Sequence, residues 1–190
     1  NWVLATAVAQ LDSWCQAGFA TPMSVNISAR HLLHPDFVPH LKALLDAHSR
    51  VDASLLQLEV LETATLGDLK RIAAIMEECN SLGVSFAIDD FGIGYGAVNS
   101  LRSLPVRSIK IDRSFIHNML TDDDDLATVQ GVIGLATAFH REVIAEGVET
   151  SSHCQALLKL GCHQVQGHGI AHPMSAARMQ VWMQEHAHRH

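Results

Sequence analysis

The sequence predicts an α/β protein with parallel strands, best described as a TIM-like (β/α)8 barrel that lacks its first strand or strands in this chain. Short apolar runs alternate with stretches of helical spacing. The runs are almost continuously apolar, as in strands that are covered on both faces. With 190 residues and 48% hydrophobic content, the chain is expected to form one domain over residues 1–190.

Six runs rich in Val, Ile and Leu are predicted strands, at residues 23–28, 55–60, 84–89, 106–111, 142–146 and 162–166. Helical spacing follows between them, at residues 35–48, 67–82, 97–104, 123–140 and 151–160, with a last helix at 175–185. No Gly/Ser-rich tract divides the chain, so a second domain is not expected.

The first residues bear on the choice between two architectures. Six strands would suffice for an open doubly wound sheet, whereas a closed barrel needs eight. One face of a first helix is predicted from Trp2, Val3, Leu4, Val8, Leu11 and Trp14. Neither a strand nor a capping residue precedes this helix, so we expect the chain to begin partway through a barrel.

Charge and cysteine content narrow the function classes. The formal net charge is −7, and no long Lys/Arg block is present, so duplex nucleic acid is not an expected partner. The four cysteines form no CxxC pair, and no apolar run has the length of a membrane span. We expect a cytoplasmic protein, anchored to a membrane only if segments outside this chain provide the anchor.

Polar side chains stand at or near the end of every predicted strand. In parallel α/β folds these strand ends meet at one rim, where barrel enzymes place their chemistry. A single such residue often only marks the point where a strand leaves the core, but six in succession favour a site. The residues are Asn26, Glu59, the pair Asp89 and Asp90, Lys110, Glu146 and Gln166.

Four of these residues are carboxylates, and together with the Asn26 amide they are an all-oxygen set that suits Mg²⁺, Mn²⁺ or Ca²⁺. Asp89 and Asp90 would repel each other unless cations were shared, and together they allow the two-ion arrangement used to hydrolyse phosphate esters. Lys110 could then stabilise a bound hydroxide or the charge that develops on a phosphoryl group. A plain salt bridge to Asp112 or Glu146 is its alternative role.

Several segments resemble the EAL domain family, bacterial phosphodiesterases that linearise cyclic di-GMP to 5′-pGpG. They occur in the family's order: VNIS, LEVLETA, FAIDDFGIGYGAVNSL, LPVRSIKIDRSFI, VIAEGVET and LGCHQVQGHGIAHPM. The resemblance implies an EAL-type barrel, a pair of Mg²⁺ or Mn²⁺ ions, and fusion to sensor or other signalling domains.

The same resemblance implies roles for individual residues. Asn26, Glu59, Asp89, Asp90 and Glu146 resemble the metal ligands, with Asp89 as the bridge between ions. Lys110 resembles the lysine that acts on the hydrolytic water, Gln166 a pocket residue, and Glu149 a supporting residue of the site. Glu62 resembles the glutamate that anchors the loop at 91–98. That loop and the helix after Asp90 are expected to form a homodimer.

The chain also departs from the family pattern. It has no Glu-Ala-Leu signature with its following arginine. The metal ligand and the phosphate-binding arginine that the family has there are therefore missing from this chain. Leu61 and Ile93 stand where the family has threonines, and Gly96 and Ala97 where it has serines. Loop closure is expected to be weaker, which leaves open a catalytically weak or inactive receptor for cyclic di-GMP, or a scaffold that binds no nucleotide.

Three other sequence patterns are weaker indications of function. The GIGYGA run resembles a dinucleotide-binding loop, but the two preceding aspartates would repel a pyrophosphate. The acidic run at 122–125 is expected to begin a helix. His168, His172 and the terminal HAHRH are interpreted as surface or tail histidines rather than a zinc site, because no third ligand accompanies them.

Overall fold

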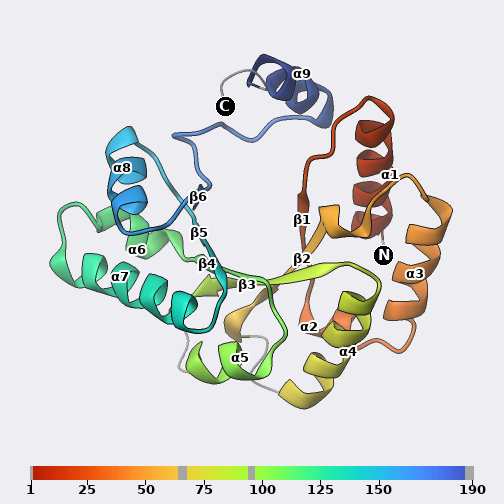
Figure 1. Ribbon diagram of the computed structural model, residues 1–190, viewed down its shortest axis with the longest axis horizontal. Helices are drawn as coiled ribbons and strands as arrows, with labels where there is room; N and C mark the ends of the chain where they lie inside the picture. Colours follow the sequence, from red (N-terminus) through yellow and green to blue (C-terminus); the bar gives the residue numbers. More distant parts are fainter. Residues whose placement is uncertain (1, 64–67, 94–96, 187–190) are drawn as a thin grey trace.

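The computed structural model describes residues 2–63, 68–93 and 97–186, and shows a curled sheet with helices along its outer side (Figure 1). Six parallel strands follow one another in sequence order. They are β1 (Met23–Asn26), β2 (Leu56–Leu61), β3 (Ser85–Phe91), β4 (Ser108–Ile111), β5 (Glu142–Ala145) and β6 (Gln164–Val165). A doubly wound sheet would reverse its strand order, so this half-barrel confirms the predicted barrel class.

The predicted helices all form, with ends shifted by a few residues. They are α1 (Trp2–Gln16), α3 (Phe37–Ala47), α4 (Leu69–Ser81), α5 (Ala97–Ser103), α7 (Asp123–Ala138), α8 (Ser151–Lys159) and α9 (Ala176–His186). The sequence did not predict α2 (Ala29–Leu32), α6 (Arg113–Asn118) or the 3₁₀ turn η1 (Ala53–Leu55). These elements are too short to produce a visible helical period. None of the described helices combines the length and apolarity that crossing a bilayer requires.

Side-chain oxygens begin several of these helices. Asp122 accepts hydrogen bonds from two backbone amides at the start of α7, whose first turn is acidic as predicted. Thr150 caps α8 in the same way, and Asp112 caps α6. Asp112 directly follows the last residue of β4, so local capping sets where the chain turns away from the rim there.

The alternation of side chains along the strands gives the sheet two different faces. Leu58, Ile88 and Ile109 are fully buried within the hydrophobic core. The alternate residues face the inside of the curl, where Gln57 accepts a hydrogen bond from Ser24 at 3.2 Å and donates one to Ser108 at 3.0 Å. Because the period is two, Glu59 and Lys110 share this polar inner face.

Two predictions about apolar segments need correction. Leu4, Val8, Leu11 and Trp14 are buried as predicted, but Trp2 and Val3 are 78% and 52% exposed. Successive residues are rotated by roughly 100° around a helix, so Trp2 lies on the side of α1 opposite the buried Leu4. The strand predicted at 84–89 runs on to Phe91, since its pairing with β4 resumes beyond the two aspartates.

Candidate active site

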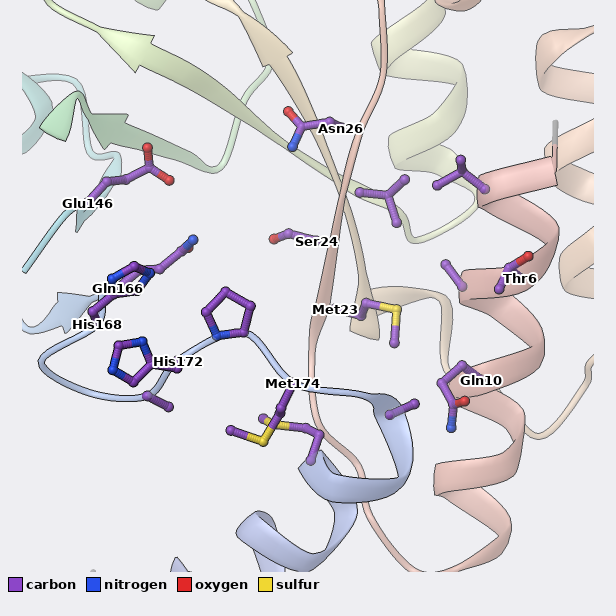
Figure 2. Close-up of a pocket in the computed structure, with 18 of the residues that line it drawn as sticks. Thr6, Gln10, Met23, Ser24, Asn26, Glu146, Gln166, His168, His172 and Met174 are labelled. Carbon is purple, nitrogen blue, oxygen red and sulfur yellow. The ribbon is translucent and has the colours of Figure 1, made fainter.

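The carboxyl ends of the strands bring the predicted residues to one side of the molecule. Asn26 ends β1 and pairs in register with Glu59 of β2. Glu146 and Gln166 directly follow β5 and β6. Figure 2 shows Asn26, Glu146 and Gln166 pointing into the same cavity from opposite walls. The structure therefore brings strand-end residues from both edges of the sheet to a common space.

A buried ammonium group lies at the centre of the site. The Nζ atom of Lys110 is 2.6 Å from Glu146, 2.8 Å from Glu59 and 3.3 Å from Asp89, and its side chain is only 4% exposed. Burial disfavours the charged form, but hydrogen bonds to Glu146 and Glu59 outweigh it and raise the pKa of Lys110 above its ordinary value. Lys110 therefore holds three carboxylates from three strands together.

A β-bulge explains how two adjacent aspartates serve one site. Side chains alternate along a regular strand, so neighbours would point to opposite faces. The pairing of β3 with β4 shifts between Ile88 and Phe91, and Asp90 takes a left-handed backbone conformation with φ of 53°. As a result, ligand oxygens of Asp89, Asp90 and Glu146 all lie within 4.8 Å of one another.

The cluster carries more negative than positive charge. Burial, followed by the charges of Asp89 and Asp112, raises the pKa of Asp90. Burial also raises the pKa of Glu146, although Lys110 acts in the opposite direction. The single ammonium of Lys110 neutralises only part of this negative charge, so a further cation at the cluster would be stabilising.

The donor set fits a divalent cation. Oxygens on opposite sides of an ion bound at 2.0–2.6 Å lie roughly 4 to 5 Å apart. The ligand oxygens of the three clustered carboxylates all lie within 4.8 Å of one another, close enough to share one ion. Asp112, which sequence reasoning considered as a salt-bridge partner of Lys110 and not as part of the carboxylate cluster, lies near Asp90, whose pKa its charge helps to raise, and it accepts a hydrogen bond from the Ser114 amide at 2.8 Å. Its signal in the sequence was its position two residues after Lys110, directly after the end of β4.

Glu62 links the segment after β2 to the segment after β3. Its side chain is buried, and its Oε2 accepts a hydrogen bond from the Gly92 amide at 3.0 Å. Leu61 and Ile93, which flank this contact, are 42% and 55% exposed. Residues 94–96 lie outside the described part of the chain, and so does the departure predicted at Gly96.

Glu149 lies apart from the buried carboxylates. It is exposed in the loop after β5, where its Oε2 is 3.7 Å from the His117 imidazole. It lines the cavity, together with Arg113 and Gln166.

The cavity has a volume of about 1170 Å³ and lies between α1, β1 and the segments that follow β5 and β6 (Figure 2). Sequence reasoning placed His168 and His172 on the surface. Both are exposed, but both also line this cavity. Their closeness in the sequence to Gln166, at the end of the last strand, could have indicated that they line the cavity.

The fold and the site define a class: parallel α/β barrels with a cluster of carboxylates at the carboxyl ends of their strands that could hold a cation. The family model described as the EAL domain matches residues 1–173. The chain therefore belongs to the EAL domain family, and the resemblance seen in the sequence is confirmed.

Curated relatives are much longer than this chain. MucR of Pseudomonas aeruginosa, named as a bifunctional diguanylate cyclase/cyclic di-GMP phosphodiesterase, is 36% identical over 180 residues, which cover 94% of this chain and 26% of MucR. Another protein of that organism, named as a cyclic di-GMP phosphodiesterase, is 33% identical over 183 residues, covering 96% of this chain and 31% of its own length. The chain thus spans about a quarter to a third of these relatives.

Solved structures agree with the fold. The EAL domain of Mycobacterium smegmatis DcpA matches with a TM-score of 0.92 at 33% identity, over 97% of this chain and 83% of that one. The phosphodiesterase part of MucR, in a complex with cyclic di-GMP, matches with a TM-score of 0.88 at 36% identity, over 94% of this chain and 72% of that one.

Proposed function

We propose that this chain is the phosphodiesterase part of a bacterial signalling protein that hydrolyses cyclic di-GMP to linear 5′-pGpG. The observation that carries the proposal is the contact of Lys110 with Glu59, Asp89 and Glu146, all within 3.3 Å, beside the second aspartate. The names of the relatives, and the nucleotide in the MucR complex, support the choice of substrate.

The metal ions of this proposal are two Mg²⁺ or Mn²⁺ ions. Their ligands would be Asn26, Glu59, Asp89, Asp90 and Glu146. Divalent ions at such a site activate water and neutralise charge on the phosphodiester. The protein's own part is to hold the carboxylates in place through Lys110, whose ammonium also stabilises negative charge near the reacting phosphate.

Three further residues act at the edges of the site in this proposal. Gln166, on the cavity wall, binds the nucleotide through its amide. Glu149 supports the loop that carries Glu146, which lies three residues earlier. Glu62 anchors the segment after Asp90, which its hydrogen bond to the Gly92 amide supports.

The setting of the domain is also proposed. We expect sensor or other signalling domains on the same protein, because the curated relatives are several times longer than the matched region. We expect a cytoplasmic site of action, where the nucleotide messenger is made and used. A homodimer through the loop at 91–98 and α5 is supported by the exposure of Ile93 and Val98, at 55% and 56%.

A second candidate function is a cyclic di-GMP receptor with little or no turnover. Leu61 and Ile93 favour it, because both are exposed and apolar where the family has threonine hydroxyls. Each lost hydroxyl removes a hydrogen bond worth about 1 kcal/mol that could hold the loop closed. Nucleotide binding without any linear product in the intact protein would support the receptor.

The test uses the intact protein with Mg²⁺ or Mn²⁺ and chromatographic detection of 5′-pGpG. Asp89→Asn is expected to lower turnover at least 100-fold, because it weakens the proposed bridge between ions. Asp36→Asn is the matched control: its carboxylate is 86% exposed, and turnover should not change. Near wild-type turnover in Asp89→Asn would contradict the proposed metal site.

A further inference from the structure

Two polar contacts join β2 to β4 on the inner face of the sheet. The Lys110 ammonium is 2.8 Å from Glu59, and the Gln57 amide donates a hydrogen bond to the Ser108 hydroxyl at 3.0 Å. Gln57 stands two residues before Glu59, and Ser108 stands two residues before Lys110. Because side chains two apart on a strand share a face, the second contact repeats the first, two residues further from the rim.

The neighbouring strand β1 continues this pattern. The Ser24 hydroxyl donates a hydrogen bond to the Gln57 side-chain oxygen at 3.2 Å, and Ser24 stands two residues before Asn26. Figure 2 shows Ser24 and Asn26 pointing into the cavity from β1. We call the three hydrogen-bonded residues the lower row: Ser24, Gln57 and Ser108. Each of them precedes by two positions a residue of the candidate site: Asn26, Glu59 and Lys110.

A small residue on β3 lets the side chains of β2 and β4 meet. Strand β3 lies between these two strands in the sheet. Its residue Ala87 pairs in register with Glu59 on one side and with Ser108 on the other, and it is fully buried. A methyl group leaves room above it that a larger side chain would fill. The contacts between β2 and β4 are therefore direct, and they hold the curl of the sheet at this level.

The lower row is polar where barrel interiors usually hold bulky branched apolar side chains. Apolar contacts have no direction, whereas a hydrogen bond requires a donor–acceptor distance of about 2.7 to 3.2 Å and a nearly straight angle. Ser108 is fully buried and Gln57 is half-buried, so little water is available to replace their bond. The bond therefore sets the spacing of β2 and β4 more narrowly than apolar packing would.

We propose that Gln57 and Ser108 are positioning residues for the hydrolysis. Their hydrogen bond fixes β2 against β4, and thereby the position of the Lys110 ammonium against Glu59. The inference rests on the proposed function, in which Lys110 and Glu59 act on the phosphodiester and its metal ions. A misplacement of about 1 Å at such groups can cost on the order of 100-fold in rate. The cavity lining includes Ser24 but, among the described residues, neither Gln57 nor Ser108, so their bond controls turnover rather than nucleotide binding.

Three variants of the intact protein test the bond: Gln57→Met, Ser108→Ala and the double variant. Methionine has about the length and volume of glutamine, so the packing is kept while the hydrogen bond is lost. With Mn²⁺, each single variant should lower kcat by roughly 10- to 100-fold and leave KM for cyclic di-GMP within about 3-fold of wild type. The double variant should be about as slow as the slower single variant, because the same bond is lost only once.

Gln164→Met is the matched control. The Gln164 amide also begins a parallel strand and donates to a neighbouring strand, to Glu142 at 3.2 Å, but it is exposed and lies on β6. The kcat of this variant should equal that of wild type. A role in stability alone would lower the urea midpoint of Gln57→Met and Ser108→Ala without changing kcat at a denaturant-free temperature where they are folded.

The outcomes distinguish this inference from the proposed function. Single variants with kcat within about 3-fold of wild type would overturn the positioning role alone. A double variant whose loss is the product of the two single losses would also overturn it, because the two residues would then act independently. An equal loss in Gln164→Met would do the same, since the effect would not be specific to the lower row. Wild-type protein that releases no 5′-pGpG would overturn both proposals.

Discussion

Replacing Lys110 by methionine tests the electrostatic core of the site. Methionine keeps most of the volume of the side chain but removes the charge that holds Glu59, Asp89 and Glu146. The three carboxylates have side chains that are 5%, 11% and 17% exposed, so water replaces little of the lost interaction. Removing one partner of a buried ion pair typically costs about 3 to 5 kcal/mol.

Protonation of one of the three carboxylates would remove an unbalanced buried charge. The free energy of this protonation therefore limits the cost of losing Lys110 and makes the cost depend on pH. A carboxylate with an ordinary pKa near 4.3 can be neutralised at pH 7 for about 4 kcal/mol, and at pH 5 for about 1 kcal/mol. Lys110→Met should therefore lower the free energy of unfolding of the metal-free protein by about 3 to 4 kcal/mol at pH 7 and by about 1 kcal/mol at pH 5.

Urea denaturation at the two pH values measures the effect. The matched control is Lys42→Met, which breaks an ion pair with Asp46 at a similar distance, 2.7 Å, but with side chains 59% and 65% exposed. That change should cost about 0.5 kcal/mol or less at either pH. A loss below 1 kcal/mol in Lys110→Met at pH 7, or a loss that does not shrink at pH 5, would refute the reasoning.

Three shorter predictions follow. Asp90→Asn should raise the melting temperature of the metal-free protein at pH 7 because burial, and then repulsion from Asp89 and Asp112, disfavour the Asp90 carboxylate. Its pKa is raised on folding, so the gain should vanish as the pH falls below the ordinary carboxyl value, where Asp90 is protonated in both states; a gain that persists there would contradict this. Gly167→Ala should lower the free energy of unfolding by about 1 to 3 kcal/mol, because its Cβ would meet the Val148 carbonyl at 2.2 Å, and unchanged urea denaturation would argue against that contact. Added Mn²⁺ should raise the melting temperature of wild type and a chelator should reverse it, whereas Asp89→Asn should respond weakly.

Local patterns were sufficient to predict the fold class. The alternation of apolar runs and helical stretches depends on residues within about ten positions of each other, and it predicted all six strands. The position of polar residues at strand ends is also local. Because parallel strands share one direction, Asn26, Glu146 and Gln166 were expected at one rim, and the structure places them around one cavity.

Contacts between distant segments decided the details of the site. The bulge at Asp89 and Asp90 depends on pairing with β4, and the charge of Lys110 is balanced by carboxylates from other strands. The sequence suggested Glu146 as a partner of Lys110 but not Glu59 or Asp89. The bulge could not be predicted from the residues around it, because alternation alone would place the two aspartates on opposite faces.

The sequence by itself determined the barrel class and the oxygen-rich character of the strand ends, which follow from local periodicity and residue type, and the resemblance of its segments to the EAL domain family indicated the family. Only the tertiary structure decided that Asp112 joins the cluster and that His168 and His172 line the cavity. The physical reason is that a side chain's partners depend on how separate strands and turns pack, and sequence spacing does not specify that packing.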